Sequence, residues 1–387
     1  MSRFLFVTLP LTGHIYPTGA IGQALADRGH DVAWVGSQAR LRPLIGQGAE
    51  VFGTGMRPYR GQADTKLASV RSLWESFVVP FAKFTLPSVE EAVRAYRPDV
   101  LIVDQHALAG AVVAERHGVL WATMASSSME ITRPYRDRPK IEAWIGGLMA
   151  RVWAAAGMPG EPPDLRFSPH LVIALTSREL TGGLEFPDHF ALVGPAIGAR
   201  PPAAPFPWEW LDAGRAHVLV TVGTMAENNA TDSTNFYARA VEALRPLGDK
   251  VQGIVIAPAD VIPDPPDHIM VATKVPLLDL MPRLDVVVCH GGLNTVCEAL
   301  INAVPLVIAP LTRDQPINAA QVVAAGAGVR VNFDRVRPAE LRAAIEHVLG
   351  DPAYREAAAR VRDSFAQAGG AAEAAARLER LAASGTR

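Results

Sequence analysis

The sequence predicts an α/β chain whose two halves each form a doubly wound, parallel-sheet domain. In the first half, an apolar run from Arg3 to Leu9 is followed by a helical pattern and by a second run from Asp31 to Val35. In the second half, strand and helix patterns alternate in the same way from His217 onward. Repeated strand–helix–strand units of this length predict parallel sheets with right-handed crossovers. The length of 387 residues is enough for two or three domains.

The composition excludes several classes of protein. A net charge of −2 gives no electrostatic basis for binding nucleic acid or an anionic membrane. The first apolar run is too short for a signal peptide, and no segment approaches the length of about 18 apolar residues that a membrane-spanning helix needs. Cys289 and Cys297 lack metal-ligand spacing, which is typical of reduced core thiols. We therefore expect a cytoplasmic protein without a transmembrane helix.

The remaining elements of the first half continue the alternation. The first helix has Pro17 near its first turn and ends before Gly29. A long helical pattern from Thr65 to Tyr96 is interrupted by Pro80 and Pro87. The other predicted elements are a turn at 10–14, a helix and a strand within 38–51, a loop at 52–62, strands at 98–104, 119–124, 171–175 and 191–193, and helices at 105–117 and 140–156.

A proline-rich segment divides the two halves. Its composition is typical of a semi-rigid, extended connector rather than of a core element. The predicted organisation is a first domain at residues 1–194, a linker at 195–213, a second domain at 214–368 and a terminal helix at 369–387. Within the second half we expect strands at 217–222 and 251–257, helices at 232–244, 316–325 and 338–349, and a helical stretch at 354–383 that is broken at Gly369 and Gly370.

One stretch of the second half, from Asp285 to Asn318, combines a predicted strand, a glycine turn, a helix and a second strand. The turn is His290-Gly291-Gly292, and the helix that follows it presents Leu293, Val296, Cys297 and Leu300 on one face. A turn of this kind directs the unpaired amides of a helix N-terminus at whatever lies above the sheet. The helix dipole and those N–H groups both favour an anion at this position.

The side chains around this turn fit a ligand that contains both phosphate and sugar. His290, Asn294 and Thr295 can donate hydrogen bonds to oxyanions. Glu298, one helical turn after Asn294, would repel phosphate but suits the two vicinal hydroxyls of a ribose. Asp314 and Gln315 follow the next strand and can hydrogen-bond a hexose. The alternative is an ordinary strand–helix–strand unit with a satisfied histidine at its turn.

Two polar residues of the first half follow predicted strands of the same sheet. His14 lies in the turn after the first strand, where a doubly wound sheet opens onto its ligand crevice. Asp104 ends a later strand at the same edge of the sheet. A buried carboxylate there could hold the imidazole in one tautomer and stabilise the imidazolium. The alternatives are a solvated loop histidine and an aspartate that caps a helix.

The stretch from Asp285 to Asn318 resembles the nucleotide-sugar signature of family 1 glycosyltransferases, the UDP-glycosyltransferase type. The matching residues are His290, Gly291, Gly292, Asn294, Thr295, Glu298, Ala299, Pro305, Pro310, Asp314, Gln315, Asn318 and Ala319. The resemblance extends through both halves and is nearest to bacterial enzymes of the macrolide glycosyltransferase type. It implies the GT-B fold, in which two Rossmann-like domains face each other across a cleft and the terminal helix crosses back to the first domain.

The resemblance also implies roles for residues of both halves. The segment Thr12 to Pro17 looks like the motif whose histidine, here His14, is the catalytic base, and Asp104 matches its aspartate. Gly223 and Thr224 match the residues that contact the donor phosphates. Val275 and Pro276 lie in the segment whose backbone binds the nucleotide base, although Leu277 stands where the family usually has glutamine. The residues expected to border the acceptor are Trp74, Phe77, Phe81, Met124 and Trp144.

The resemblance implies an inverting transfer of a hexose to a hydroxyl of a small hydrophobic natural product, such as a polyketide, macrolide, flavonoid or carotenoid. An α-linked donor would give a β-glycoside. Asp314-Gln315 resembles users of UDP-glucose, which makes this the first expected donor and a TDP-deoxysugar the second. The sequence has no Asp-x-Asp motif at the donor site, so we expect neither a metal nor a cofactor. The expected assembly is a monomer or a homodimer.

Two other functions would use the same second half, although the aromatic residues at 74–84 and 144–153 argue against the first and the presence of His14 and Asp104 argues against the second. A nucleotide-sugar epimerase of the same fold would keep the donor site but would not need aromatic residues near an acceptor. A non-catalytic partner or nucleotide-sugar sensor would not need His14 or Asp104. The sequence identifies neither the acceptor nor the position of attack, and it leaves O-, C- and N-linkage open.

Overall fold

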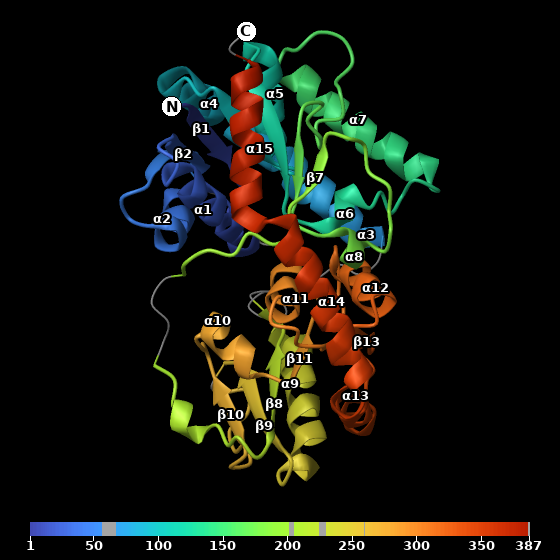
Figure 1. Cartoon of the computed structure of the whole chain (residues 1–387). Helices are drawn as coiled ribbons and strands as arrows, with labels where there is room; N and C mark the ends of the chain where they lie inside the picture. The colour runs from blue at the N-terminus through green and yellow to red at the C-terminus, as the bar shows by residue number, and fades with distance from the viewer. Residues whose placement is uncertain (56–66, 201–204, 224–229, 259, 386–387) are drawn as a thin grey trace. The chain divides into compact units, whose positions relative to one another are not determined.

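The computed structural model describes residues 1–55, 67–200, 205–223, 230–258 and 260–385. The chain divides into two compact units (Figure 1). Unit 1 comprises Met1–Ser177, Leu184–Pro201 and Gln367–Arg387, and unit 2 comprises Arg178–Gly183 and Pro202–Ala366. Residues 178–183, which fall within the predicted first domain, therefore group with unit 2, and the terminal helix groups with unit 1.

Unit 1 is built on a seven-stranded sheet with the order β3-β2-β1-β4-β5-β6-β7, and all of its pairings are parallel. Its strands are β1 (Arg3–Val7), β2 (Asp31–Gly36), β3 (Glu50–Gly53), β4 (Val100–Asp104), β5 (Leu120–Ala125), β6 (Val172–Ala174) and β7 (Phe190–Leu192). Its helices are α1 (Thr12–Ala26), α2 (Gln38–Ile45), α3 (Leu67–Arg71), α4 (Val79–Tyr96), α5 (Leu108–His117), α6 (Ser128–Ile131), α7 (Pro139–Ala155) and α15 (Gly370–Ser384). The order reverses between β1 and β4, which is the position where a doubly wound sheet opens onto its ligand crevice.

Helices cover both faces of this sheet. On one face, Phe4 and Phe6 of β1 pack in a single apolar cluster with Ile21 of α1 and Leu378 of α15. The opposite face is covered by α4, α5 and α7, which contact one another. Because alternate side chains of a strand point to opposite faces, a strand covered on both sides must be apolar throughout. This requirement explains the unbroken apolar runs in the sequence.

The last helix, α15, is part of unit 1 and lies against α1, β4 and β5 (Figure 1). Glu379 of α15 accepts hydrogen bonds from Arg28 Nη1, at 2.6 Å, and from His30 Nε2, at 2.8 Å. The preceding helix, α14 (Pro352–Ala368), belongs to unit 2. Gly369 separates the two helices with a φ of 87°, which glycine adopts without steric cost.

Two local predictions for unit 1 were wrong. Helix α1 begins at Thr12, so His14 and Pro17 lie inside the helix rather than in a preceding turn and at its start. The amides of His14 and Ile15 already donate to the Leu11 carbonyl, at 2.9 and 3.0 Å, which starts the helix early. Pro87 lies inside α4 without ending it, and the irregular turn is a π-helical segment, Ser72–Val78, that precedes Pro80.

Unit 2 is built on a six-stranded parallel sheet with the order β10-β9-β8-β11-β12-β13. Its strands are β8 (Ala216–Thr221), β9 (Val251–Ile256), β10 (Ile269–Ala272), β11 (Val286–Cys289), β12 (Leu306–Ile308) and β13 (Gly328–Arg330). Its helices include α8 (Arg178–Thr181), α9 (Ala230–Leu244), α10 (Leu277–Leu280), α11 (Leu293–Leu300), α12 (Gln315–Ala324), α13 (Pro338–Gly350) and α14. The order reverses between β8 and β11, as it does between β1 and β4 in unit 1.

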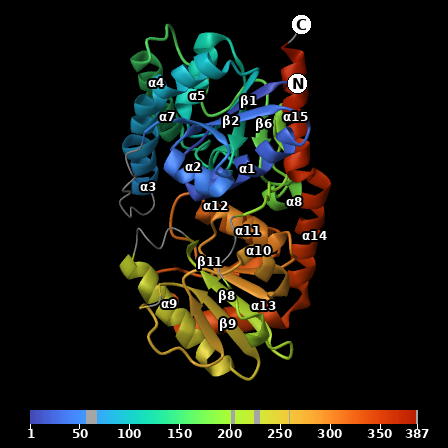
Figure 2. The same cartoon turned by 90° about the vertical axis from the view of Figure 1, so that its left-hand side faces the viewer.

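The two faces of this sheet divide the side chains of β11 between two apolar clusters. Val286 and Val288 pack with residues of α9 and α13, the two helices seen beside the strands in Figure 2. Val287 and Cys289 pack with residues of α11, α12 and α14 on the opposite face. The strands β10 and β13 at the two edges of the sheet were not predicted; most of their residues are partly or fully exposed, unlike the buried strands at its centre. The prediction of two doubly wound parallel sheets is confirmed.

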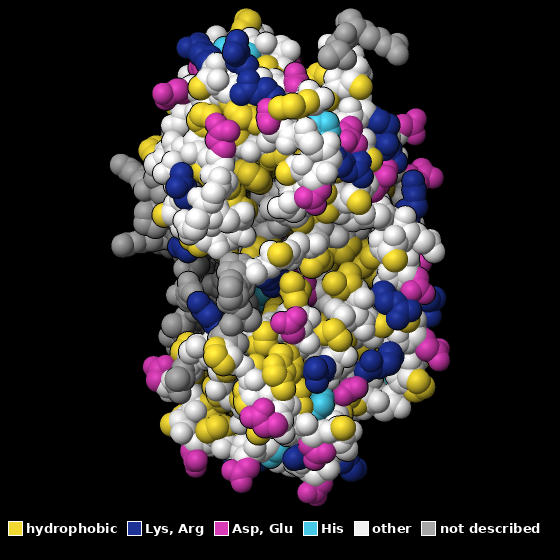
Figure 3. All heavy atoms as spheres, turned by 60° about the vertical axis from the view of Figure 1, so that its left-hand side comes forward, with side chains coloured by type: hydrophobic (Ala, Val, Ile, Leu, Met, Phe, Trp, Pro, Cys, Tyr) yellow, Lys and Arg dark blue, Asp and Glu magenta, His cyan; other side chains and the backbone are white. Residues whose placement is uncertain are grey.

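Positive and negative side chains are mixed on the surface that Figure 3 shows. On the face in Figure 3, acidic and basic side chains are interspersed over both units, as the net charge of −2 leads one to expect. Among the described helices, none is both long and apolar enough to cross a bilayer.

The packing of α5 on the sheet of unit 1 generates a prediction about Gly110. A Cβ atom added there would lie 2.8 Å from both γ-methyl carbons of Val103 and 3.2 Å from Cβ of Val7. We expect Gly110→Ala to lower the free energy of unfolding by about 1–3 kcal/mol, because overpacking outweighs the gain in helix propensity. Denaturant unfolding measures this difference.

The matched control is Gly146→Ala in α7, where an added Cβ would meet no atom within 4 Å. This variant should raise the free energy of unfolding by up to about 1 kcal/mol, since alanine is the better helix former. Equal effects of the two substitutions would show that Gly110 does not set the distance between α5 and the sheet.

Candidate active site

The structure brings His14 and Asp104 together at the point where the strand order of unit 1 reverses. Asp104 is the last residue of β4, and His14 lies in the first turn of α1, directly after the neighbouring strand β1. His14 Nδ1 lies 2.7 Å from Asp104 Oδ2. The Asp104 side chain is fully buried, whereas 18% of the His14 side chain is exposed. The predicted pair therefore forms a hydrogen bond between a solvent-accessible ring and a buried carboxylate.

Three groups donate hydrogen bonds to the Asp104 carboxylate. Besides His14, the Ser126 hydroxyl donates to Oδ2 at 2.7 Å and the His106 amide donates to Oδ1 at 3.0 Å. Burial raises the pKa of Asp104, but the interactions with His14, His106 and Ser126 outweigh burial and hold this pKa below its ordinary value. Asp104 is therefore an ionised acceptor at neutral pH. It is not the helix cap of the alternative interpretation, because the N-cap of α5 is Ala107.

An ionised Asp104 fixes the tautomer of His14. Because a carboxylate only accepts hydrogen bonds, the proton of the neutral imidazole is on Nδ1 and the lone pair is on Nε2. Nε2 is then the atom that can accept a proton from a substrate hydroxyl. As the ring becomes positively charged, Asp104 stabilises it, which is the arrangement that general-base catalysis requires.

Ser126 is a third member of this group that the sequence analysis did not identify. It follows β5, the strand next to β4, and its Oγ lies 2.7 Å from Asp104 Oδ2 and 2.7 Å from His14 Nδ1. Since Ser126 contacts the nitrogen that faces Asp104 rather than Nε2, His14 does not activate it as a nucleophile. Its hydroxyl positions the pair. A strand end followed by serine at the edge that carries Asp104 is the signal that could have identified it.

The five aromatic and apolar residues predicted to border the acceptor differ in exposure. Trp74, Phe77 and Met124 are buried within unit 1, and Met124 belongs to the apolar cluster beneath the sheet. Phe81 and Trp144 are partly exposed. The first three residues are therefore packed within unit 1. Contact with an acceptor stays a prediction for all five residues, and Phe81 and Trp144 are the more accessible ones.

In unit 2, the predicted anion site lies where the strand order reverses between β8 and β11. His290 follows β11 directly, and its ring lies between two glycines. A Cβ added at Gly223 would lie 2.7 Å from His290 Cε1, and one added at Gly292 would lie 2.7 Å from Nε2. Both positions require glycine because the ring packs directly on the backbone. Thr221 Oγ1 accepts the Gly223 amide at 3.1 Å and fixes the end of β8.

The buried imidazole of His290 is neutral at physiological pH. Burial lowers its pKa to about 4 from 6.5. Its Nδ1 is buried and has no hydrogen-bond partner among the residues that the structure describes. Since buried polar atoms nearly always have partners, this nitrogen marks a position where a ligand atom can bind. His290 would act there as a neutral hydrogen-bond donor or acceptor rather than as a cation.

Helix α11 begins at Leu293, three residues after His290. Its N-cap is Gly292, which has no side chain to satisfy the first amides of the helix. Gly291 has a φ of 88°, and a Cβ there would lie 2.9 Å from Ile308 Cγ2. Asn294 and Thr295 in the first turn are partly exposed. The glycine turn therefore leads to an uncapped helix N-terminus, which is the geometry that binds phosphate.

The remaining predicted donor residues lie around the same turn, and several have structural contacts. Glu298 is buried. Gln315 is also buried, and its Oε1 accepts the amides of Leu311 and Thr312 at 2.9 and 3.1 Å. Asn318 Nδ2 donates to the Gly291 carbonyl at 2.9 Å and to Asp314 Oδ2 at 3.0 Å. The side-chain oxygen Oε1 of Gln315 thus holds the loop. Contact with a hexose stays a prediction for Asp314 and Gln315.

Val275 and Pro276 precede helix α10; Pro276 is buried and Val275 is partly buried. Thr224 lies outside the described residues.

Cys289 and Cys297 are buried free thiols, as predicted. Burial raises the pKa of Cys289 to about 12, so this thiol is not a nucleophile.

Known proteins share this fold and sequence pattern over almost the whole chain. Residues 245–381 match the family model described as erythromycin biosynthesis protein CIII-like, C-terminal domain. The 4'-demethylrebeccamycin synthase of Lentzea aerocolonigenes is 28% identical, over 94% of this chain and 96% of its own. A solved glycotransferase of kitacinnamycin is 26% identical with a TM-score of 0.80, and the match covers 98% of this chain and 99% of that one. The spinosyn rhamnosyltransferase SpnG complexed with thymidine diphosphate is 25% identical with a TM-score of 0.77, over 97% of this chain and 100% of its own.

The two Rossmann-like parallel-sheet units and the similarity to solved glycosyltransferases over almost the whole chain identify the GT-B fold. Residues 245–381 form an EryCIII-like C-terminal domain, and the chain is a glycosyltransferase of the natural-product type. The resemblance found in the sequence is thereby confirmed.

The depressed pKa of His290 generates a prediction about stability in acid. Above pH 6.5 the ring is neutral in both the folded and the unfolded chain, so it has no effect on the pH dependence. Between pH 6.5 and about 4 the unfolded chain binds a proton that the folded chain does not, and unfolding becomes more favourable as the pH falls. The full effect is about 3 kcal/mol, from a difference of roughly 2.5 pKa units at 1.36 kcal/mol each.

The test compares thermal unfolding of the wild-type protein and of His290→Asn across this pH range. We expect the stability of the variant relative to wild type to improve as the pH falls from 7 to about 4.5. Parallel curves for the two proteins would mean that His290 titrates as freely in the folded chain as in the unfolded one.

Proposed function

We propose that this protein transfers a hexose from a nucleotide-diphospho-sugar to a hydroxyl group of a small hydrophobic natural product, with inversion at the anomeric carbon. The observation that carries the proposal is the 2.7 Å contact between His14 Nδ1 and the buried, ionised Asp104. This contact leaves Nε2 as the basic nitrogen of a partly exposed ring. A hydroxyl is a poor nucleophile until such a base removes its proton.

The proposed reaction forms one bond and breaks one bond at the anomeric carbon, and it transfers one proton. The acceptor oxygen forms a bond to the anomeric carbon while its proton passes to His14 Nε2. The bond between that carbon and the diphosphate oxygen breaks, and its electron pair stays on the nucleoside diphosphate. Attack from the face opposite the leaving group converts an α-linked donor into a β-glycoside. The imidazolium then loses its proton to solvent.

The donor-binding residues of unit 2 act on the leaving group. Negative charge accumulates on the diphosphate as the bond breaks, and hydrogen-bond donors fixed beforehand at that place lower the barrier. The proposed donors are the first amides of α11, the imidazole of His290 and the side chains of Asn294 and Thr295. Since these groups stabilise the charge without a cation, we propose that no metal and no cofactor take part.

UDP-glucose is the first donor that we propose and a TDP-deoxysugar is the second. Asp314 and Gln315 support glucose, because a carboxylate and an amide suit the hydroxyls of a hexose that has lost none of them. The similar rhamnosyltransferase SpnG was solved with thymidine diphosphate, which supports the second choice. Glu298 is proposed to bind the ribose hydroxyls and the backbone at Val275 and Pro276 to bind the base.

The proposed acceptor is a hydrophobic molecule with at least one hydroxyl. Phe81 and Trp144, the two partly exposed aromatic residues of the predicted set, would contact its rings. Similar proteins bear the names of enzymes for kitacinnamycin, spinosyn and demethylrebeccamycin, which supports a polyketide-like or polycyclic aromatic substrate.

The test incubates the purified chain with UDP-glucose or TDP-glucose and a panel of phenols and macrolide aglycones, with and without EDTA. We expect nucleoside diphosphate release together with a hexose mass increase of the acceptor, unaffected by EDTA. His14→Ala should lower kcat by about 10²–10⁴-fold, because the general base is lost, while nucleotide binding stays unchanged. His170→Ala, in which an exposed histidine of unit 1 is removed, is the matched control and should stay within about twofold of wild type.

Other outcomes would contradict the proposal in distinct ways. Conversion of the nucleotide sugar without an acceptor would favour an epimerase. Nucleotide binding without turnover of any acceptor would favour a sensor or partner protein. Full activity of His14→Ala would remove this residue from the mechanism.

A further inference from the structure

A buried group of charged residues lies next to the Asp104 carboxylate in unit 1. Its centre is Arg166, which is 4% exposed. The guanidinium donates to Glu130 of α6 at 2.9 Å, to Glu142 of α7 at 3.1 Å, and through Nε and Nη2 to both oxygens of Asp164 at 2.9 Å. One buried cation is thus shared by three carboxylates that come from two helices and a loop.

His106 connects this group to Asp104. Its amide donates to Asp104 Oδ1 at 3.0 Å, and its Nε2 lies 3.2 Å from Glu130 Oε1. Burial raises the pKa of Glu130, but His106 and Arg166 outweigh burial and hold this pKa below its ordinary value, so Glu130 is ionised. Because a carboxylate only accepts, His106 Nε2 carries a proton and donates it to Glu130. The rings of His106 and Trp74 are nearly perpendicular and pack in a T-shaped arrangement, with the ring centres 6.0 Å apart.

Such a network is a poor means of stabilising a fold. Desolvation of several ions offsets most of their attraction, and an apolar cluster of the same volume is often more stable. Glu130, Arg166 and His106 are nevertheless all more than nine-tenths buried. The network contacts Asp104, which orients His14, through His106. This placement points to a role in positioning the base.

We propose that Glu130 is a positioning residue for the general base: by holding the His106 side chain it fixes the His106 amide on Asp104, and through Arg166 it ties this amide to α7 and to the loop at Asp164. The proposal rests on the proposed function for its kinetic consequences, whereas the coupling between Glu130 and His14 can be measured without substrate. The chemical basis of the proposal is that the His106 amide donates to Asp104 Oδ1, while the His106 side chain is held by Glu130.

The charged and titratable groups around the pair come from several elements. His14 is faced by Asp104 of β4 and by the Ser126 hydroxyl after β5. Glu130 is faced by Arg166, by His106 and by Tyr135. Burial, followed by the charge of Glu130, raises the pKa of Tyr135 to about 12, so this phenol carries no charge near neutral pH.

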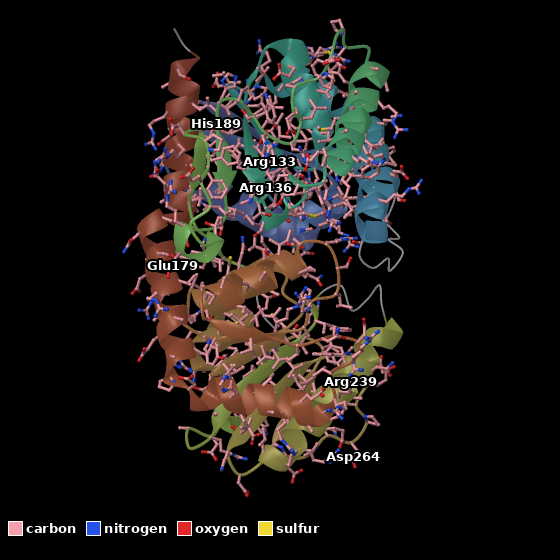
Figure 4. All side chains as sticks on the ribbon, turned by 90° about the vertical axis from the view of Figure 1, so that its right-hand side faces the viewer. Arg133, Arg136, Glu179, His189, Arg239 and Asp264 are labelled. Carbon is pink, nitrogen blue, oxygen red and sulfur yellow. The ribbon has the colours of Figure 1, made fainter. Side chains whose placement is uncertain are left out.

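The outer members of the network are Asp164, Glu142 and Arg133. Arg133, labelled on the face of unit 1 in Figure 4, lies 3.7 Å from Asp164 and over the ring of Phe167. It adds a second positive charge beside Asp164. Removal of Glu130 alone therefore leaves Arg166 paired with two carboxylates, and we expect the variant to fold.

The experiment compares wild type, Glu130→Gln and Glu142→Gln. Glu142→Gln is the matched control, because it removes a carboxylate from the same guanidinium. Among the described residues, Glu142 makes no hydrogen bond or ion pair with His106. For Glu130→Gln we expect kcat to fall about tenfold with little change in KM, since a misplaced base affects the transition state. The acid limb of the pH–rate profile should move about 0.5 pH units lower, because loss of a nearby negative charge disfavours the His14 imidazolium.

The same shift is measured independently by NMR titration of His14 in histidine-labelled protein, with the signal assigned through His14→Gln. Glu142→Gln should stay within about twofold in kcat and should leave the titration unchanged. If Glu130→Gln does not fold, His106→Asn replaces it: the amide to Asp104 remains, the contact with Glu130 is lost, and kcat should again fall.

Three results would overturn the proposal. The first is a Glu130→Gln protein that is less stable but has unchanged kcat and an unchanged His14 titration, which would make the network structural only. The second is an equal effect of Glu142→Gln. The third is a fully active His106→Asn. If the wild-type protein transfers no sugar, the proposed function fails, but the NMR titration still decides whether Glu130 acts on His14.

Discussion

The hydrogen bond between a buried, ionised Asp104 and Nδ1 of His14 is the interaction on which the geometry of the candidate active site depends. A carboxylate at the end of an apolar strand is unfavourable unless donors surround it. Unit 1 supplies them from three segments of chain: the first turn of α1, the amide of His106 and the hydroxyl of Ser126. These segments meet because β1, β4 and β5 are adjacent in one parallel sheet, whose strands all end at the same edge. The topology of the sheet thus produces a base with a defined tautomer.

Unit 2 uses the same position in its sheet with the opposite electrostatic result. His290 also follows a strand where the order reverses, but it is buried between Gly223 and Gly292, and among the residues that the structure describes no carboxylate shifts its pKa. Burial alone therefore determines its pKa and keeps the ring neutral. One histidine can become a cation stabilised by Asp104, whereas the other stays a neutral hydrogen-bonding group beside a helix N-terminus. This difference in surroundings separates a ring that can take up a proton from one that stays neutral.

The sequence predicted the features that follow from periodicity and from strand ends, and it missed those that depend on tertiary contacts. Apolar runs and glycine turns placed both sheets, and Asp104 and His14 were paired because each follows a strand. Ser126 was overlooked because a serine in a polar stretch has no distinctive pattern. The network of Glu130 and Arg166 joins residues far apart in the chain, so no local spacing reveals it. The start of α1 was placed too late because the proline in its second turn looked like a helix N-terminus.

The account is tested most directly by the tautomer of His14, measured from ¹⁵N chemical shifts of the imidazole in histidine-labelled protein above the pH at which the ring becomes neutral. An ionised Asp104 that accepts from Nδ1 requires the neutral ring to carry its proton on Nδ1, and Asp104→Asn should remove this preference. A wild-type ring with its proton on Nε2 would contradict the account, because the nitrogen needed to accept the substrate proton would already be occupied.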